Sequence, residues 1–130
     1  VPMQDETDTQ IVQYSPFSKM QELLDYVCTL YSKSNIKIVY KKHPKATCNI
    51  VPNNNCIEVF DNVHHYLPYA TSVIGINSTV LLEALLYHNR VKTLGIGITS
   101  RRFCNEEHKQ YITHLAKRQL NWHDVQQIRY

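Results

Sequence analysis

Glycine is scarce in this chain of 130 residues, which has only three. The three are not spaced as the GxGxxG loop that binds dinucleotides in dehydrogenases, and no GxxxxGK[ST] phosphate loop is present. Both absences argue against those two classes of nucleotide-binding enzyme. The longest uninterrupted apolar runs are also far too short for a membrane span.

The cysteines lack the spacing of a metal site. Neither CxxC nor a histidine at a zinc interval accompanies any of the four, which are Cys28, Cys48, Cys56 and Cys104. No basic-then-apolar leader opens the sequence. We therefore expect reduced thiols in a cytoplasmic protein, with no metal and no transmembrane segment.

The composition is that of an ordinary globular domain. Hydrophobic residues make up 43% and charged residues 19%, and the length predicts one domain with a real core. The formal net charge of +3 is small and scattered, which argues against a nucleic-acid partner.

Apolar periodicity predicts strands and helices in alternation. Strands are expected at residues 36–42, 57–60, 72–76 and 91–95, and helices at 18–34, 62–69, 79–87, from 105 and from 121, after a loop at 4–18. This order is typical of βαβ crossovers. We expect an α/β, Rossmann-like fold: a parallel sheet with helices on both faces.

Ligands of such sheets bind at the carboxyl ends of the strands, and one loop expected there is K-K-H-P, residues 41–44. Pro44 favours an extended backbone at His43, so the strand should end there. Three lysines surround the imidazole: Lys41, Lys42 and Lys45. Such a cationic corner suits a phosphate. Alternatively, the His-Pro pair only ends the strand and the lysines are solvated.

A second loop, Asn77-Ser78-Thr79, precedes a helix. Free backbone N–H groups and hydroxyls at a helix start can bind an anion. Plain N-capping is the alternative, and the two are compatible. Gly95-Ile96-Gly97, where the last strand ends, could make a close-approach turn beside the ligand or a simple strand exit.

Glu83 is an acidic residue in an otherwise apolar helix. It lies four residues after Thr79 and hence on the same helix face. A carboxylate there could accept from the two hydroxyls of a ribose. The alternative is a salt bridge to Lys41, Lys42 or Arg90.

Three motifs together resemble a known family. K-x-H-P, I-N-S-T-V-x-x-E-A-L-L and V-K-T-L-G begin at residues 41, 76 and 91. They resemble the capsule polysaccharide synthesis glycosyltransferases, which include retaining transferases that use CMP-β-Kdo. The opening Q-x-E-x-D-x-x-I, residues 4–11, looks like the loop that begins the second domain of that group. The resemblance covers residues 1–97.

The resemblance implies one half of a two-domain, GT-B glycosyltransferase of capsule or lipopolysaccharide synthesis. His43 and the Ser78-Thr79 pair would hold the CMP phosphate, Glu83 the ribose, and two lysines would add positive charge (Lys41 and Lys42). Other positions implied in the cleft are Gln4, Pro44, Asn77 and Gly95. Residues 98–103 depart from the family pattern, so the sugar identity does not carry over.

The missing half would bind a glycan or glycolipid acceptor. Because CMP has a single phosphate and the sequence has no DxD triplet, we expect neither a metal nor another cofactor. No catalytic residue is assigned in these residues; Asp8 and Glu6 are the candidate carboxylates. The chain by itself is expected to bind nucleotide without transferring sugar, in the cytoplasm or at the inner membrane face through the rest of the enzyme.

Two other functions compete with this interpretation. A UDP-sugar transferase or epimerase domain would need more phosphate donors than one His-Pro corner and one helix start supply. A non-catalytic interaction module of the same fold would need an exposed apolar patch, to which Trp122 and Tyr130 could contribute.

Overall fold

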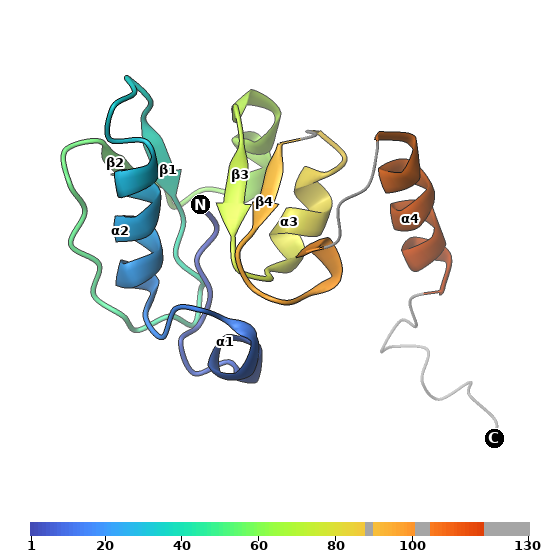
Figure 1. Ribbon diagram of the computed structural model, residues 1–130, viewed down its shortest axis with the longest axis horizontal. Coiled ribbons are helices and arrows are strands. Elements are labelled where there is room, and N and C mark those ends of the chain that lie inside the picture. Colours follow the sequence, from blue (N-terminus) through green and yellow to red (C-terminus); the bar gives the residue numbers. More distant parts are fainter. Residues whose placement is uncertain (88–89, 101–104, 119–130) are drawn as a thin grey trace.

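The computed structural model describes residues 1–87, 90–100 and 105–118 (Figure 1). In these residues, four strands form two parallel pairs. β1 (Ile38–Tyr40) pairs with β2 (Cys56–Glu58), and β3 (Val73–Gly75) pairs with β4 (Val91–Thr93). Three of the four runs expected as strands contain one, and the fourth, 57–60, overlaps β2, which begins one residue earlier. Each observed strand is only three residues long.

The first residues of the chain lie between the two pairs of strands. On one side, Pro2 forms a parallel bridge with Lys41, next to β1. On the other side, a Cβ added to Gly75 would lie 3.4 Å from Pro2 Cγ, and Gln4 bonds to Asn77. Since Pro2 neighbours Gly75 and Gln4 neighbours Asn77, this segment runs in the same direction as β3. Ladder hydrogen bonds join the named strands only in pairs, so one continuous Rossmann-like sheet stays a prediction.

Four α-helices and three single turns of 3-10 helix are present in the described residues. The α-helices are α1 (Thr9–Tyr14), α2 (Met20–Leu30), α3 (Thr79–Ala84) and α4 (Asn105–Arg118). The 3-10 turns are η1 (Val63–His65), η2 (Leu67–Tyr69) and η3 (Ile98–Ser100). None of these helices is long and apolar enough to cross a membrane.

Three expected helices or loops differ from the structure. α1 lies in the segment expected to be a loop, and residues 62–69 form two 3-10 turns in place of one helix. α3 stops at Ala84, because the following amides bond three residues back, as Leu86 N does to Glu83 O at 3.0 Å. The helix expected from residue 121 lies outside the described residues.

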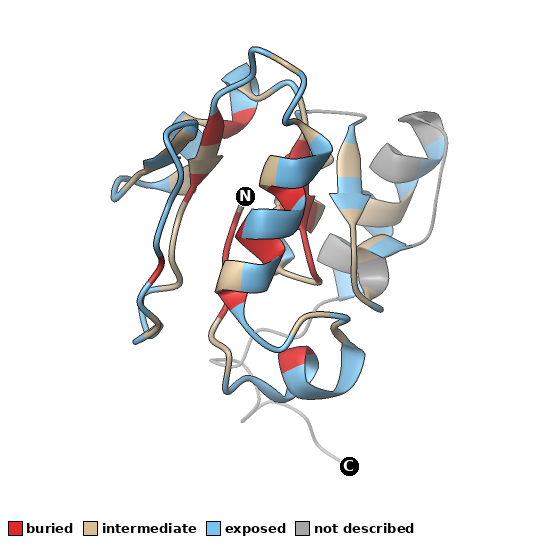
Figure 2. Ribbon diagram, turned by 60° about the vertical axis from the view of Figure 1, so that its left-hand side comes forward, coloured by how far each residue is buried: buried red, intermediate tan, exposed pale blue. Residues whose placement is uncertain are grey.

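The core divides into two clusters on opposite faces of β3. Ile74 and Ile76 pack in one cluster with α2, whereas Val73 packs in the other with Leu81 and Ala84 of α3. Alternate residues of a strand point to opposite faces, so α2 and α3 cover different faces of β3. Figure 2 shows buried residues concentrated in α2 and the strands behind it, while α1 is mostly exposed.

Candidate functional site

The carboxyl ends of the strands bring three of the predicted loops to one edge of the molecule. Residues 4–6 follow the N-terminal segment, residues 41–44 follow β1, and residues 77–79 follow β3. Because these segments run parallel, their ends meet on the same side. This is the edge where ligands of open α/β sheets bind.

Gln4 and Asn77 bind each other across this edge. Gln4 Nε2 donates to Asn77 Oδ1 at 2.9 Å, and the backbone N–H of Asn77 donates to Gln4 Oε1 at 3.2 Å. Asn77 Nδ2 donates to the carbonyl oxygens of Gln10, at 3.2 Å, and Ile96, at 3.3 Å. Gln4 is buried. These two residues, expected to line the cleft, thus brace the loop that carries Ser78.

Gly95 makes a close approach to the protein itself. A Cβ at this position would lie 2.6 Å from Ile76 Cγ2 and 2.7 Å from the carbonyl oxygen of Tyr14. Its backbone N–H donates to Ile76 O at 3.1 Å. Glycine is required here by the packing of this loop against β3 and α1.

The His43 corner has a defined tautomer. His43 Nδ1 accepts a hydrogen bond from the backbone N–H of Lys45 at 3.2 Å. A neutral imidazole that accepts at Nδ1 carries its proton on Nε2, which leaves Nε2–H as a donor. The pKa of Asp5 is lowered mainly by hydrogen bonds from Thr7. The loop that carries His43 follows Lys41, whose carbonyl oxygen accepts from the backbone N–H of Met3 at 2.9 Å, so this loop starts beside the segment that carries Gln4.

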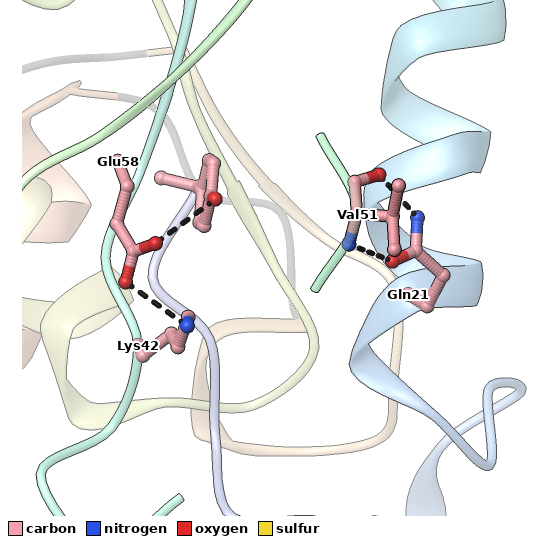
Figure 3. Close-up of polar contacts among 5 residues, drawn as sticks. Gln21, Lys42, Val51 and Glu58 are labelled. Atoms are coloured by element: carbon pink, nitrogen blue, oxygen red, sulfur yellow. Dashed lines mark hydrogen bonds and ion pairs between the residues drawn. The ribbon is translucent and has the colours of Figure 1, made fainter. Parts of the chain in front are cut away.

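Both lysines of the predicted phosphate site have partners on β2 or just after it. Lys42 Nζ lies 3.2 Å from Glu58 Oε1 (Figure 3), and Lys41 Nζ donates to the carbonyl oxygen of Phe60 at 2.8 Å. Tyr40 donates to the other Glu58 oxygen at 3.1 Å. A phosphate would have to compete with Glu58 for Lys42. No pattern in the sequence singles out Glu58, since an acidic residue in a short strand is usually solvated.

Ser78 caps α3 in the way the sequence predicts. Its Oγ accepts from the backbone N–H of Val80 at 3.2 Å, and Thr79, the first helical residue, is exposed. The hydroxyl hydrogen of Ser78 is not used by this cap. Capping is thereby confirmed, and anion binding stays a prediction.

Glu83 pairs with His64. Glu83 Oε2 lies 3.2 Å from His64 Nε2, and the two side chains are 42% and 43% exposed. The salt bridge considered from the sequence had Lys41, Lys42 or Arg90 as its partner; the structure gives a histidine of η1 instead. No pattern in the sequence joins these two residues, because His64 lies in η1, before β3, and Glu83 lies in α3, after it.

The two candidate carboxylates both bond to helix starts. Asp8 Oδ1 accepts from the backbone N–H of Gln10 at 2.8 Å and caps α1. Glu6 Oε1 accepts from the backbone N–H of Met20 at 2.7 Å, the first residue of α2. Helix capping accounts for both residues, and a catalytic role has no separate support.

A cavity of about 560 Å³ lies away from most of these residues. Its lining comes mainly from η1, η2 and the amino ends of β1 and β3. Among the predicted site residues, its lining includes Lys41 but not His43, Ser78 or Glu83. Pro44 is exposed beside His43.

No family model, curated protein or solved structure matches the chain. Within the described ranges, no group of three histidine, cysteine or acidic side chains is arranged to hold a metal ion.

Proposed function

We propose that this chain is the donor-nucleotide-binding domain of a glycosyltransferase in capsule or lipopolysaccharide synthesis, with a Rossmann-like sheet and CMP-Kdo as donor. The observation that carries the proposal is that the His43 and Ser78 loops follow β1 and β3 on either side of the segment that holds Gln4. The sugar and nucleotide identities rest on the sequence resemblance alone.

In this proposal, donors at the edge hold the single phosphate of CMP. His43 Nε2–H is one donor, because Nδ1 is engaged by Lys45 N–H. The hydroxyls of Ser78 and Thr79 are the others. Lys42, on exchanging Glu58 for the phosphate, would offset the negative charge that develops as CMP leaves.

Glu83 would bind the ribose hydroxyls. His64 already engages Glu83 Oε2, so the ribose would bind Oε1 or displace the imidazole. Both side chains are partly exposed, and even with a protonated imidazole such an exposed pair contributes only about 0.2–1 kcal/mol. That is small enough for two ribose hydrogen bonds to replace it.

The proposal is tested by titrating the purified chain with CMP, with UMP, UDP and AMP as comparison ligands, by calorimetry or amide chemical shifts. We expect CMP to bind best and binding to be lost in His43→Ala. The matched control is His65→Ala, which removes an exposed histidine of η1. Equal binding of all nucleotides, or full CMP binding by His43→Ala, would contradict the proposal.

A second pair of variants separates the ribose role of Glu83 from a purely structural one. Glu83→Ala removes both the ribose acceptor and the ion pair, whereas His64→Ala removes the ion pair alone. We expect CMP binding to fall in Glu83→Ala and to persist in His64→Ala. If both variants keep wild-type affinity, Glu83 does not hold the ribose.

The same titration decides between the competing functions. Preference for UDP over CMP would favour a UDP-sugar transferase or epimerase domain. Absence of nucleotide binding would favour an interaction module. The observation that supports this alternative is a set of exposed apolar side chains, including Phe60, Tyr69 and Leu86, which are 80%, 87% and 62% exposed. A glycan or glycolipid acceptor would bind to another part of the enzyme, in the cytoplasm, so the chain alone should not transfer sugar.

A further inference from the structure

Two free thiols from different parts of the fold are in direct contact. Cys28 lies in α2, Cys56 is the first residue of β2, and their Sγ atoms are 3.2 Å apart. A disulfide bond is about 2.05 Å long, so the sulfurs need to approach by only roughly 1 Å. Both residues are half-buried against the larger core cluster.

The backbone holds Cys56 firmly in this position. Cys56 pairs with Ile38 in the ladder between β1 and β2, and the backbone N–H of Cys56 donates to Asn53 O at 3.0 Å. The thiol also contacts Asn53 Oδ1 at 3.1 Å. Cys28 is fixed by α2, between the buried Val27 and the remainder of the last helical turn. The two sulfurs therefore meet because secondary structure presents them to each other.

We propose that Cys28 and Cys56 form an oxidation site, at which a hydroperoxide converts the two thiols into a disulfide that joins α2 to β2. One sulfur attacks the peroxide O–O bond, which yields a sulfenic acid and releases an alcohol, or water from hydrogen peroxide. The second sulfur attacks the sulfenic sulfur, the S–S bond forms and water leaves. Two thiols lose two electrons and two protons, and one peroxide is reduced.

The surroundings suggest the order of these steps. Burial, and next the neighbouring Cys56, raise the pKa of Cys28 to about 11. Cys28 is therefore a thiol at neutral pH and a poor attacking nucleophile. We therefore assign the first attack on the peroxide to Cys56. Cys28 can still attack the sulfenic sulfur, because the two sulfurs are held 3.2 Å apart and this proximity offsets its weaker nucleophilicity.

Cys48 supplies a matched control inside the same protein. It is half-buried against the same cluster, and burial likewise raises its pKa. In the part of the chain that the structure describes, it has no second thiol within hydrogen-bonding distance. Contact between sulfurs, more than burial, is what distinguishes Cys28 and Cys56.

The test is hydrogen peroxide treatment of the folded chain, followed by alkylation, digestion and mass spectrometric mapping of all four cysteines. We expect the Cys28–Cys56 cross-linked peptide to predominate in the wild type and in Cys48→Ser, and to be missing from Cys28→Ser and Cys56→Ser. The same treatment in guanidinium chloride should remove the selectivity. Three results would overturn the proposal. Cys28 and Cys56 could remain alkylatable in the folded chain, a pairing with Cys104 could predominate, or the unfolded chain could give the same pairing pattern.

Discussion

Gly95→Ala tests the close packing at the carboxyl edge of the strands. The described glycines all have negative φ, so alanine can adopt the backbone conformation at this position. The obstacle is contact: the new Cβ would lie 2.6 Å from Ile76 Cγ2 and 2.7 Å from Tyr14 O. The second atom belongs to the backbone and also accepts the N–H of Ile96 at 2.9 Å, so it cannot move without weakening that bond.

The magnitude follows from two opposing effects. Overpacking of this kind destabilises by about 1–3 kcal/mol, and the rigid backbone contact places Gly95→Ala near the upper value. Replacing glycine also restricts the unfolded chain, which stabilises by about 0.4–1 kcal/mol. The expected net loss is about 2 kcal/mol in the free energy of unfolding, or a fall in Tm of roughly 8 °C for a chain of this size.

The assay is urea denaturation followed by circular dichroism, with Gly75→Ala as the matched control. At Gly75 the nearest atoms are the Leu81 methyl groups, at 3.2 and 3.4 Å, which belong to the flexible end of a side chain. We expect this control to stay within about 1 kcal/mol of the wild type. If Gly95→Ala is as stable as Gly75→Ala, the reasoning about the carboxyl edge is refuted.

Three further predictions concern hydrogen bonds. Gln4→Ala should cost about 2 kcal/mol in urea denaturation, because Asn77 Oδ1 and the backbone N–H of Asn77 lose their partner; wild-type stability would show that this brace contributes nothing. Gln21→Ala should cost about 1 kcal/mol, through the loss of two bonds to the backbone of Val51 (Figure 3); an unchanged urea midpoint would contradict it. Burial, and next the bond to Glu58, raise the pKa of Tyr40 to about 12. A raised pKa means that the folded protein is stabilised while Tyr40 is protonated. This stabilisation is complete below about pH 10, the ordinary tyrosine pKa, and disappears as the pH rises to about 12. Tyr40→Phe should lack this part of the alkaline fall in unfolding free energy, and an alkaline profile equal to that of the wild type would rule it out.

The strands could be predicted because their residues carry a local signal. The run at 73–76 is continuously apolar, which is typical of a strand covered on both faces, and Val73 and Ile74 do pack in different clusters. The pairing of strands is a long-range property, so the two separate ladders could not be derived from the same pattern.

The helices show where local signals mislead. A capping box that starts at Ser18, the first residue of the expected helix, would use Gln21. The structure instead has Lys19 as the N-cap of α2 and uses Glu22, which accepts from Lys19 N–H at 3.2 Å. Both Gln21 and Glu22 can complete a capping box. The loop around Val51 decides between them, because it engages the Gln21 amide. α1 was missed since it buries only Ile11 and so has no apolar stripe.

The candidate site could be predicted in its parts but not in its pairings. Residue types and the His-Pro and Ser-Thr motifs identified loops that the structure brings to one edge. The partners of their side chains come from distant segments: Glu58 for Lys42, and His64 for Glu83. Which charged side chains pair depends on which loops cover each face of the fold. That arrangement is a long-range property, so it cannot be predicted from local sequence patterns.

The four hydrogen bonds that join Asn77 to Gln4, Gln10 and Ile96 have a kinetic consequence. The loop can shift only if bonds to three separate segments break together, so its conformation is set before any ligand arrives. A molecule that binds here loses little free energy to ordering the protein. Association should therefore follow a single exponential whose rate rises in proportion to ligand concentration, without the plateau that a preceding rearrangement of the loop would impose.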